Sequence, residues 1–387
     1  MGAQVEAAVM TGPGSIELRR YPYPEPGPGE AVVKVAAVGI CGTDKHTYRG
    51  EASQYAGTLH AREVPYPIIP GHEIVAVVEG PGAQGLEADS EGTRLAAGDR
   101  VVVAPDLPCG KCYFCRGSFP YYYCEALHDY GNSLSCDDPP HLFGGWAEYI
   151  YLFPGARFFR VPDGISTEVA VFTEEMAVTH GLDTARSIAA QRGGDVFSET
   201  VLVMGVGPLG MCHCIKAQAI GAGALIAMDT SVARLEAAAD LLGASLTLDA
   251  GRLSRLERRQ AVEEATGGRG ADVVVDCTGS MDALGEAVEL VRQGGVVVEA
   301  GAFVDLGGGE HFRPAVVCSK EVAILGVGGE RSDHYSGALR LLQKTSERLR
   351  LADLISHRFP LGAAQRAIET ASGSSSLKVL ITPGSGR

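Results

Sequence analysis

The sequence lacks an apolar run long enough to cross a membrane, and its first residues lack the basic-then-apolar pattern of a secretory signal. It also lacks a basic excess, since 33 Lys and Arg stand against 47 Asp and Glu, for a net charge of −14. An acidic surface repels nucleic-acid phosphates and anionic lipids. We therefore expect a cytoplasmic protein with neither nucleic-acid nor membrane partners.

The ten cysteines are expected to be thiols and metal ligands, because disulfides are rare in a reducing cytoplasm. Four of them are closely spaced, at Cys109, Cys112, Cys115 and Cys124. Such a dense thiolate cluster is typical of a tetrahedral zinc site. A closed four-cysteine site stabilises a loop and leaves no position open for a substrate.

The chain has 387 residues, which favours two domains rather than one. Up to about residue 160, short β-branched runs alternate with Pro and Gly, a pattern that predicts an antiparallel β-rich domain. The strands of this domain are expected at Val32–Ala36, Ile74–Val78, Val101–Val103 and Tyr149–Tyr151.

From about residue 194, strands and helices alternate, with helices expected at Ser231–Leu242 and Asp282–Arg292. The apolar strands of this part end at Met204, Met228, Leu248, Asp276, Ala300 and Val327. Six such strands predict an α/β fold with a doubly wound parallel sheet. A helix at Leu361–Ala371 and a strand at Lys378–Ile381 are expected to return to the first domain. The domain boundaries predicted are 1–160, 161–335 and 336–387.

A dinucleotide-binding turn is indicated by Gly205-Val206-Gly207-Pro208-Leu209-Gly210, which follows an apolar strand. Its glycines allow the tight turn, the approach of the diphosphate and close helix packing. The next strand ends in Asp229, where a carboxylate binds adenosine ribose hydroxyls and repels a 2′-phosphate. We therefore expect NAD rather than NADP. Arg234 is either a residue flanking the adenine or a solvated helix residue.

A second metal site is indicated by the segments Cys41–His46 and Gly71–Glu73. Together they supply a thiolate, an imidazole and a carboxylate, a ligand set that can leave one zinc position open for substrate. Beside a nucleotide-binding fold, this combination favours a catalytic metal over a buried cysteine and an ordinary turn histidine.

With these motifs the chain resembles, nearly end to end, the zinc-dependent medium-chain dehydrogenase/reductase superfamily, and within it the polyol and threonine dehydrogenase branch. Further matching segments are Gly98–Val101, Gly144–Tyr149 and Leu377–Pro383. The resemblance implies an antiparallel GroES-like catalytic domain followed by a Rossmann domain that binds the dinucleotide.

The resemblance also implies a catalytic zinc ion bound by Cys41, His72 and a carboxylate. Glu73 and Glu174 compete for the third position, and in relatives either acid can bind directly while the other acts through water. Glu174 is preferred, but Glu175 stands where relatives have proline, so the register is open by one residue. Asp44 is expected to accept a hydrogen bond from His72, or else to act as a turn acceptor.

Two further residues are implied to carry a proton to water. Thr43 and His46 occupy the positions of a hydroxyl and an imidazole relay, although His46 is alternatively an exposed loop residue.

In the four-cysteine segment, this chain has one residue more before Cys124 than relatives commonly have, which leaves Cys136 as a competing ligand. The insertion Glu51–Pro67 is expected to overhang the substrate cleft.

The function predicted is that of a zinc-dependent, NAD(H)-linked alcohol dehydrogenase acting on a small polar secondary alcohol or polyol, or on the matching ketone or aldehyde. A homodimer or homotetramer is expected. Two alternatives stay open: a redox-inactive nucleotide-binding paralogue, and a zinc-assisted lyase or zinc-free reductase of the same fold.

Overall fold

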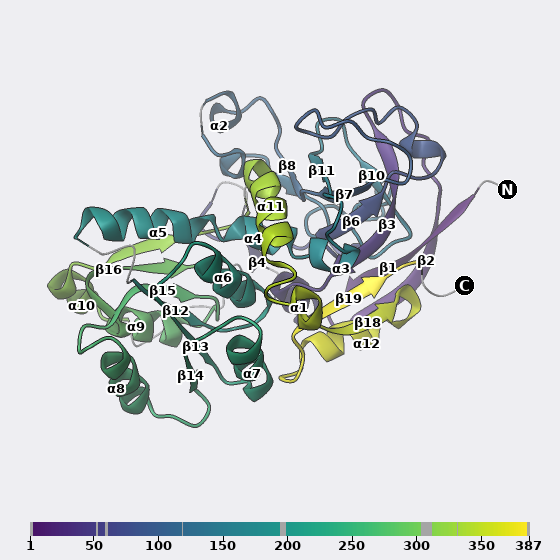
Figure 1. Cartoon of the computed structure of the whole chain (residues 1–387). Helices are drawn as coiled ribbons and strands as arrows, with labels where there is room; N and C mark the ends of the chain where they lie inside the picture. The colour runs from purple at the N-terminus through teal and green to yellow at the C-terminus, as the bar shows by residue number, and fades with distance from the viewer. Residues whose placement is uncertain are drawn as a thin grey trace.

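The computed structural model describes residues 3–51, 53–58, 61–117, 119–193, 199–302, 312–330 and 332–384. Two sheets lie side by side, one in the β-rich part and one in the strand-helix part, with helices between them (Figure 1). No helix of these ranges is both long and apolar enough to span a bilayer.

The β-rich part is built around a seven-stranded sheet whose strands are predominantly antiparallel. The four strands predicted for this domain are confirmed as β3, β6, β7 and β10. The hairpin of β1 (Gln4–Gly12) and β2 (Ser15–Pro22) lies beside this sheet. The strands of the sheet are β3 (Ala31–Gly39), β6 (Glu73–Val77), β7 (Arg100–Val103), β10 (Tyr149–Leu152), β11 (Phe158–Arg160), β18 (Ile355–Pro360) and β19 (Lys378–Thr382).

The second sheet has six parallel strands in the order β14-β13-β12-β15-β16-β17, which confirms the predicted doubly wound fold. Its central strands β12, β13 and β15 are buried on both faces, as their unbroken apolar runs require, whereas the edge strands β14 and β17 are partly exposed. They are β12 (Thr200–Met204), β13 (Ala224–Asp229), β14 (Leu246–Asp249), β15 (Ala271–Asp276), β16 (Val291–Glu299) and β17 (Ala323–Gly326).

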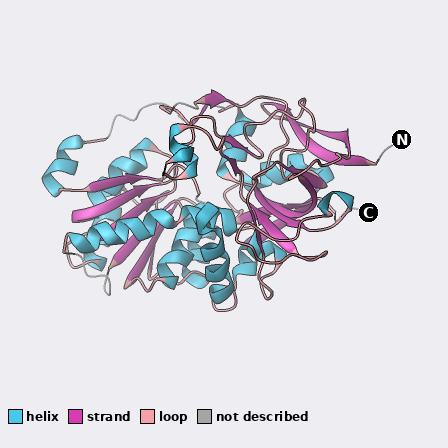
Figure 2. Cartoon of the chain, turned by 90° about the horizontal axis from the view of Figure 1, so that it is seen from above, coloured by secondary structure: helices cyan, strands magenta, loops and turns pink. Residues whose placement is uncertain are grey.

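Helices cover both faces of this sheet, as the view from above shows (Figure 2). One apolar layer contains residues of α5, α6 and α7, and the other contains residues of α8, α9 and α10. The expected helix at 282–292 runs too far: α9 ends at Leu290, because Val291 is already extended and begins β16. The helices are α5 (His180–Gln191), α6 (Pro208–Ala219), α7 (Val232–Asp240), α8 (Arg255–Ala265), α9 (Met281–Leu290) and α10 (Pro314–Lys320).

The C-terminal segment returns to the sheet that the N-terminal part of the chain forms. After α11 (Tyr335–Thr345), strand β19 pairs in parallel with β18 and in antiparallel fashion with β3. The last strand therefore lies inside the sheet formed by the first residues, and α12 (Ala364–Ala371) packs against β18 and β19 (Figure 1). This closure places Lys378 next to the segments that carry Cys41 and His72.

Candidate functional site: a metal cluster facing a nucleotide cleft

Cys41 stands at the beginning of α1 (Gly42–Arg49), where a capping box fixes its position. Asp44 Oδ2 accepts the backbone N–H of Cys41 at 2.9 Å, and its Oδ1 accepts the N–H of Gly71 at 3.3 Å. One buried carboxylate thus joins the Cys41 turn to the segment that contains His72.

Among the described residues, His72 does not form the expected hydrogen bond to Asp44. Both Asp44 oxygens accept backbone N–H groups instead, so the turn-acceptor interpretation describes its contacts better. Asp44 still acts on His72 by charge. Burial alone would lower the pKa of His72, but Asp44 and Glu174 raise it to about 9.

The structure brings Cys41, His72 and Glu73 together, with one potential ligand atom from each lying within 4.8 Å of the others. His72 Nδ1 and Glu73 Oε1 are both buried and have no hydrogen-bond partner among the described residues. Buried polar atoms without partners are rare and call for an ion or another explanation. Sulfur, nitrogen and oxygen donors in one place fit a zinc ion with an open position.

The other oxygen of Glu73 is held by Lys378, whose side chain is fully buried. Lys378 Nζ also lies 2.9 Å from Glu175 Oε2. Burial alone would lower the pKa of Lys378, but the two carboxylates raise it, so the ammonium group stays charged. Lys378 therefore orients Glu73 and leaves its Oε1 for another partner.

The two acids at the start of α4 (Thr173–Val178) have different positions. Glu174 lines the cavity and is buried, but it does not belong to the cluster formed by Cys41, His72 and Glu73. Glu175, the fallback ligand, is engaged with Lys378. The geometry thus favours Glu73, rather than the preferred Glu174, as the third direct ligand.

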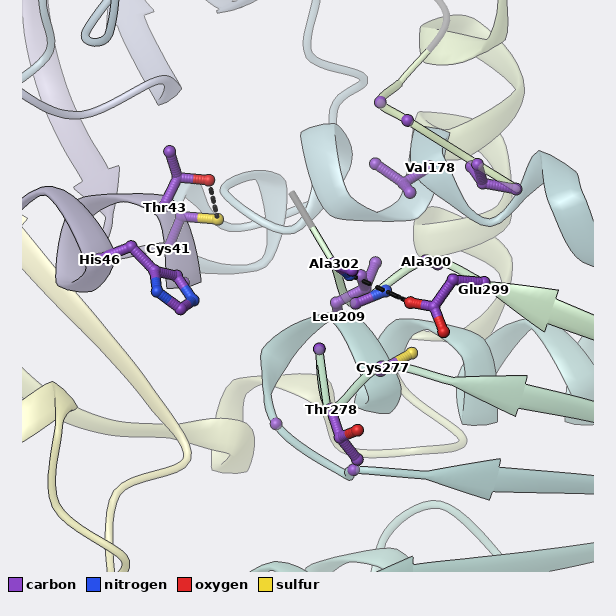
Figure 3. Close-up of a pocket in the computed structure, with 18 of the residues that line it drawn as sticks. Cys41, Thr43, His46, Val178, Leu209, Cys277, Thr278, Glu299, Ala300 and Ala302 are labelled. Carbon is purple, nitrogen blue, oxygen red and sulfur yellow. Dashed lines mark hydrogen bonds between the residues drawn. The ribbon is translucent and has the colours of Figure 1, made fainter. Parts of the chain in front are cut away.

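Thr43, in the first turn of α1, and His46, in its last turn, lie on the same side of the cavity as Cys41 (Figure 3). Thr43 Oγ1 lies 3.9 Å from Cys41 Sγ. His46 is half-buried, and its Nδ1 lies 2.6 Å from Glu51 Oε2 and 3.1 Å from an Arg49 nitrogen. Depending on its tautomer, this nitrogen donates to Glu51 or accepts from Arg49, a property suited to passing a proton.

The four predicted structural ligands also gather, because one sulfur from each of Cys109, Cys112, Cys115 and Cys124 lies within 4.8 Å of the others. Backbone N–H groups of Cys115 and Glu125 lower the pKa of Cys112 to about 6, which favours a thiolate.

The competing ligand Cys136 lies elsewhere. Its buried thiol accepts a hydrogen bond from Tyr21 and donates to the Pro67 carbonyl. The extra residue before Cys124 is thus absorbed by the loop, and the four-cysteine group is complete without Cys136.

The glycine turn after β12 has the geometry of a phosphate-binding loop. Gly205 has φ 79°, and a Cβ on Gly210 would lie 1.9 Å from the Gly205 carbonyl oxygen. Both positions therefore require glycine. Pro208 begins α6, and Gly207, Pro208 and Leu209 line the cavity.

Asp229 ends β13 next to this turn. Its Oδ2 accepts the N–H of Val206 at 2.7 Å and its Oδ1 accepts that of Ser231 at 2.8 Å. Arg234 lies over the turn, 3.8 Å from Asp229 Oδ2 and 3.8 Å from the position a Cβ on Gly207 would take. It is thus a cavity-lining residue rather than a fully solvated one.

One continuous cavity of about 1780 Å³ connects the metal cluster to the glycine turn. The cavity is lined by Cys41, His72 and Glu174 at one end and by Gly207, Asp229 and Arg234 at the other. A volume of this size exceeds that of a typical small-molecule site and suits a dinucleotide together with a substrate.

Part of the insertion Glu51–Pro67 lines this cavity through Tyr55–Thr58, whereas Ala52, Leu59 and His60 lie outside the described residues. Tyr55 Oη donates to Asp129 Oδ2 and Arg62 donates to Asp129 Oδ1, both at 2.8 Å. The sequence does not single out Asp129, because Tyr55 and Arg62 are more than sixty residues away from it in the chain and no local motif marks it.

Two family models match the chain: the alcohol dehydrogenase GroES-like domain over residues 27–163 and the zinc-binding dehydrogenase domain over residues 208–344. The chain belongs to the zinc-binding alcohol dehydrogenase family. This relation places the protein among oxidoreductases that act on CH–OH groups.

Its relatives within this family include 5-exo-hydroxycamphor dehydrogenase of Pseudomonas putida, 31% identical over 97% of this chain and 98% of the relative. Human sorbitol dehydrogenase is 30% identical over 96% and 94% of the two chains. Among solved structures, an alcohol dehydrogenase of Thermotoga maritima has a TM-score of 0.85 at 29% identity, covering 98% of this chain and all of the other.

The two metal sites predict two zinc ions per subunit. Cys124→Ser should remove one of them and lower the melting temperature, because a structural site stabilises its loop on binding. Elemental analysis combined with thermal unfolding measures both effects. Cys318→Ser is the matched control, since Cys318 is exposed and outside both clusters. One zinc ion per chain, together with equal melting of the two variants, would contradict this assignment.

Proposed function

We propose that the protein is a zinc-dependent, NAD(H)-linked dehydrogenase of a polar secondary alcohol or polyol. The observation that carries this proposal is one cavity that is lined both by Cys41 and His72, which meet Glu73 in the metal cluster, and by the glycine turn of a dinucleotide-binding sheet. Relatives named as sorbitol, erythritol/L-threitol and hydroxycamphor dehydrogenases support the substrate class.

Bound at the cluster, zinc would supply a Lewis acid for the substrate oxygen, and nicotinamide would supply the hydride acceptor. The chain's own residues then have to orient the alcohol and remove its hydroxyl proton. The Thr43 hydroxyl, beside Cys41, is placed to accept that proton, and His46 with Glu51 would carry it to water. The balance is one hydride to the cofactor and one proton to solvent.

Other residues that line the cavity are suited to act on the substrate and to limit the access of water. Glu174 lines the metal end and would act on the metal through water or on the substrate. Tyr55, Phe114 and Leu127 also line the cavity, and their apolar parts would limit the access of water to the reacting atoms. The intact ligand set argues against a redox-inactive paralogue and a zinc-free reductase, and an assay of alcohol-dependent NADH formation separates a dehydrogenase from a lyase.

A cofactor prediction follows from Asp229, whose carboxylate is fixed beside the glycine turn. Asp229→Ser should weaken NAD binding and relax the exclusion of NADP, because the charge that repels a 2′-phosphate is lost. Titration of both cofactors against the variant and against Asp240→Ser measures this change, since Asp240 is exposed at the end of α7 and does not line the cavity. A parent protein that already prefers NADP would defeat the assignment; one structural neighbour of 25% identity is described as bound to NADP.

The catalytic prediction separates ligands from relay. Cys41→Ala should abolish alcohol oxidation and leave NADH binding nearly intact, because the two sites are built by different parts of the chain. His46→Ala should lower the rate by roughly 10²-fold, since solvent can partly replace a relay base. Burial lowers the pKa of His46. The neutral ring accepts the proton, so the parent rate should fall as pH drops through this pKa.

The deciding measurement is the pH–rate profile of His46→Ala beside the parent, over a panel of polyols and secondary alcohols. The fall in rate at low pH that is expected of the parent should be absent from the variant. His357→Ala is the control for loss of an imidazole, because His357 lies on β18 and does not line the cavity. An unchanged rate and profile in His46→Ala would remove His46 from the proposed mechanism.

A further inference from the structure

Two acidic side chains meet beneath the nucleotide cleft. Asp276 ends β15, Glu299 ends β16, and the two residues are direct partners in the parallel register. The turns that follow these strands touch, since a Cβ on Gly301 would lie 2.4 Å from the backbone nitrogen of Gly279. This close approach holds both carboxyl groups in one place.

The hydrogen-bond donors around the pair are too few for two carboxylates. Asp276 Oδ1 accepts from the Thr278 N–H at 2.8 Å and from its hydroxyl at 2.7 Å. Glu299 Oε1 accepts from the N–H groups of Gly301 and Ala302 at 3.0 and 3.1 Å. Asp276 is fully buried, and its Oδ2 has no donor among the residues described. A proton held between the two side chains would supply that donor.

Among the described residues, no cation of a neighbouring element is among the groups that act most strongly on either acid, so none replaces this proton there. Besides Glu299, the charged group that acts on Asp276 is Glu286 of α9, which Arg258 of α8 already binds through two 2.7 Å contacts. Between the carboxyl groups and α6 lies the neutral thiol of Cys277, 3.7 Å from His213 Nδ1. Burial lowers the pKa of His213 to about 4, so this imidazole is neutral as well.

The pKa values of both acids are shifted in the direction that a shared proton requires. Burial raises the pKa of Asp276, against its two bonds to Thr278. Burial, and then the charge of Asp276, raise the pKa of Glu299 to about 7. Both shifts favour a proton held by the pair at a pH where two ordinary carboxyl groups would be ionised.

The position of Glu299 relates this proton to the cofactor. Glu299, Cys277 and Thr278 line the cavity, opposite Cys41, Thr43 and His46 (Figure 3). In a doubly wound sheet the dinucleotide lies across the strand ends, with its diphosphate at the first turn. Since Asp229 marks the adenosine side on β13, the ends of β15 and β16 lie under the nicotinamide half.

We propose that Asp276 and Glu299 share one proton, and that its loss makes the cleft prefer the oxidised cofactor over the reduced one. This inference rests on the proposed binding of a nicotinamide dinucleotide. The oxidised ring carries a positive charge and the reduced ring carries none, so an added negative charge nearby attracts only the oxidised form. By reciprocity, binding of the oxidised form expels the shared proton.

The test is calorimetric titration of NAD⁺ and of NADH, from about pH 5.5 to about pH 8.5, against the zinc-loaded parent and Glu299→Gln. In the parent, the affinity for NAD⁺ relative to NADH should rise about five- to tenfold with pH. NAD⁺ should also release more protons than NADH near neutrality, measured from the dependence of the heat on the buffer. In Glu299→Gln the ratio should be flat and this excess release lost.

Glu264→Gln is the matched control, because Glu264 is exposed on α8 and loses the same charge. If Glu299→Gln does not fold, Asp276→Asn gives the second test, and its ratio should change at lower pH because Glu299 then titrates without a charged neighbour. This inference alone is overturned if the ratio of NAD⁺ to NADH affinity in the parent does not change with pH. It is also overturned if the variant that folds shows the same dependence of this ratio on pH as the parent. Failure of the parent to bind either dinucleotide overturns the proposed function and this inference with it.

Discussion

The site depends on one buried ammonium group. Lys378 of β19 is fully enclosed between Glu73 of β6 and Glu175 of α4, so it connects the end of the chain to both parts of the molecule. A charge in this position is stable only because carboxylates surround it, and removal of one partner from a buried ion pair costs about 3–5 kcal/mol. The return of the C-terminal strand is therefore coupled to the arrangement of the metal cluster.

This constraint gives three neighbouring glutamates three different environments. Glu73 offers one oxygen to Lys378 and keeps the other beside Cys41 and His72. Glu175 lines the cavity too but is engaged with Lys378, whereas Glu174 lines the cavity next to the metal cluster. The same side chain thus fits a ligand, a charge partner and a cavity wall, according to which polar atoms its neighbours leave free.

The sequence predicted features whose cause is local. The glycine turn at Gly205–Gly210 and the close spacing of Cys109, Cys112 and Cys115 each specify a backbone conformation within a few residues, and the alternation of strands and helices sets the doubly wound sheet. It did not predict the contacts that tertiary packing creates. Lys378 lies 305 positions from Glu73, and no periodicity links them.

The same limit applies to two other residues. Asp44 stands where a hydrogen bond from His72 is plausible, but its oxygens accept the backbone N–H groups of Cys41 and Gly71 instead. Glu299 ends an apolar strand, and nothing in the sequence distinguishes it from other polar residues at strand ends. Only the strand register shows that it lies opposite Asp276. A cytoplasmic location and a homo-oligomeric state stay predictions from the sequence.

The central claim is that Lys378 leaves Glu73 free to complete a metal site with Cys41 and His72. Anomalous diffraction at the zinc absorption edge, from crystals of the zinc-loaded protein, tests it most directly. Two peaks per subunit are predicted, one among the four cysteines and one in contact with Cys41, His72 and Glu73, with Lys378 still on the other oxygen of Glu73. A peak at the four cysteines alone, or a second peak that binds Glu174 while Glu73 stays remote, would contradict the account.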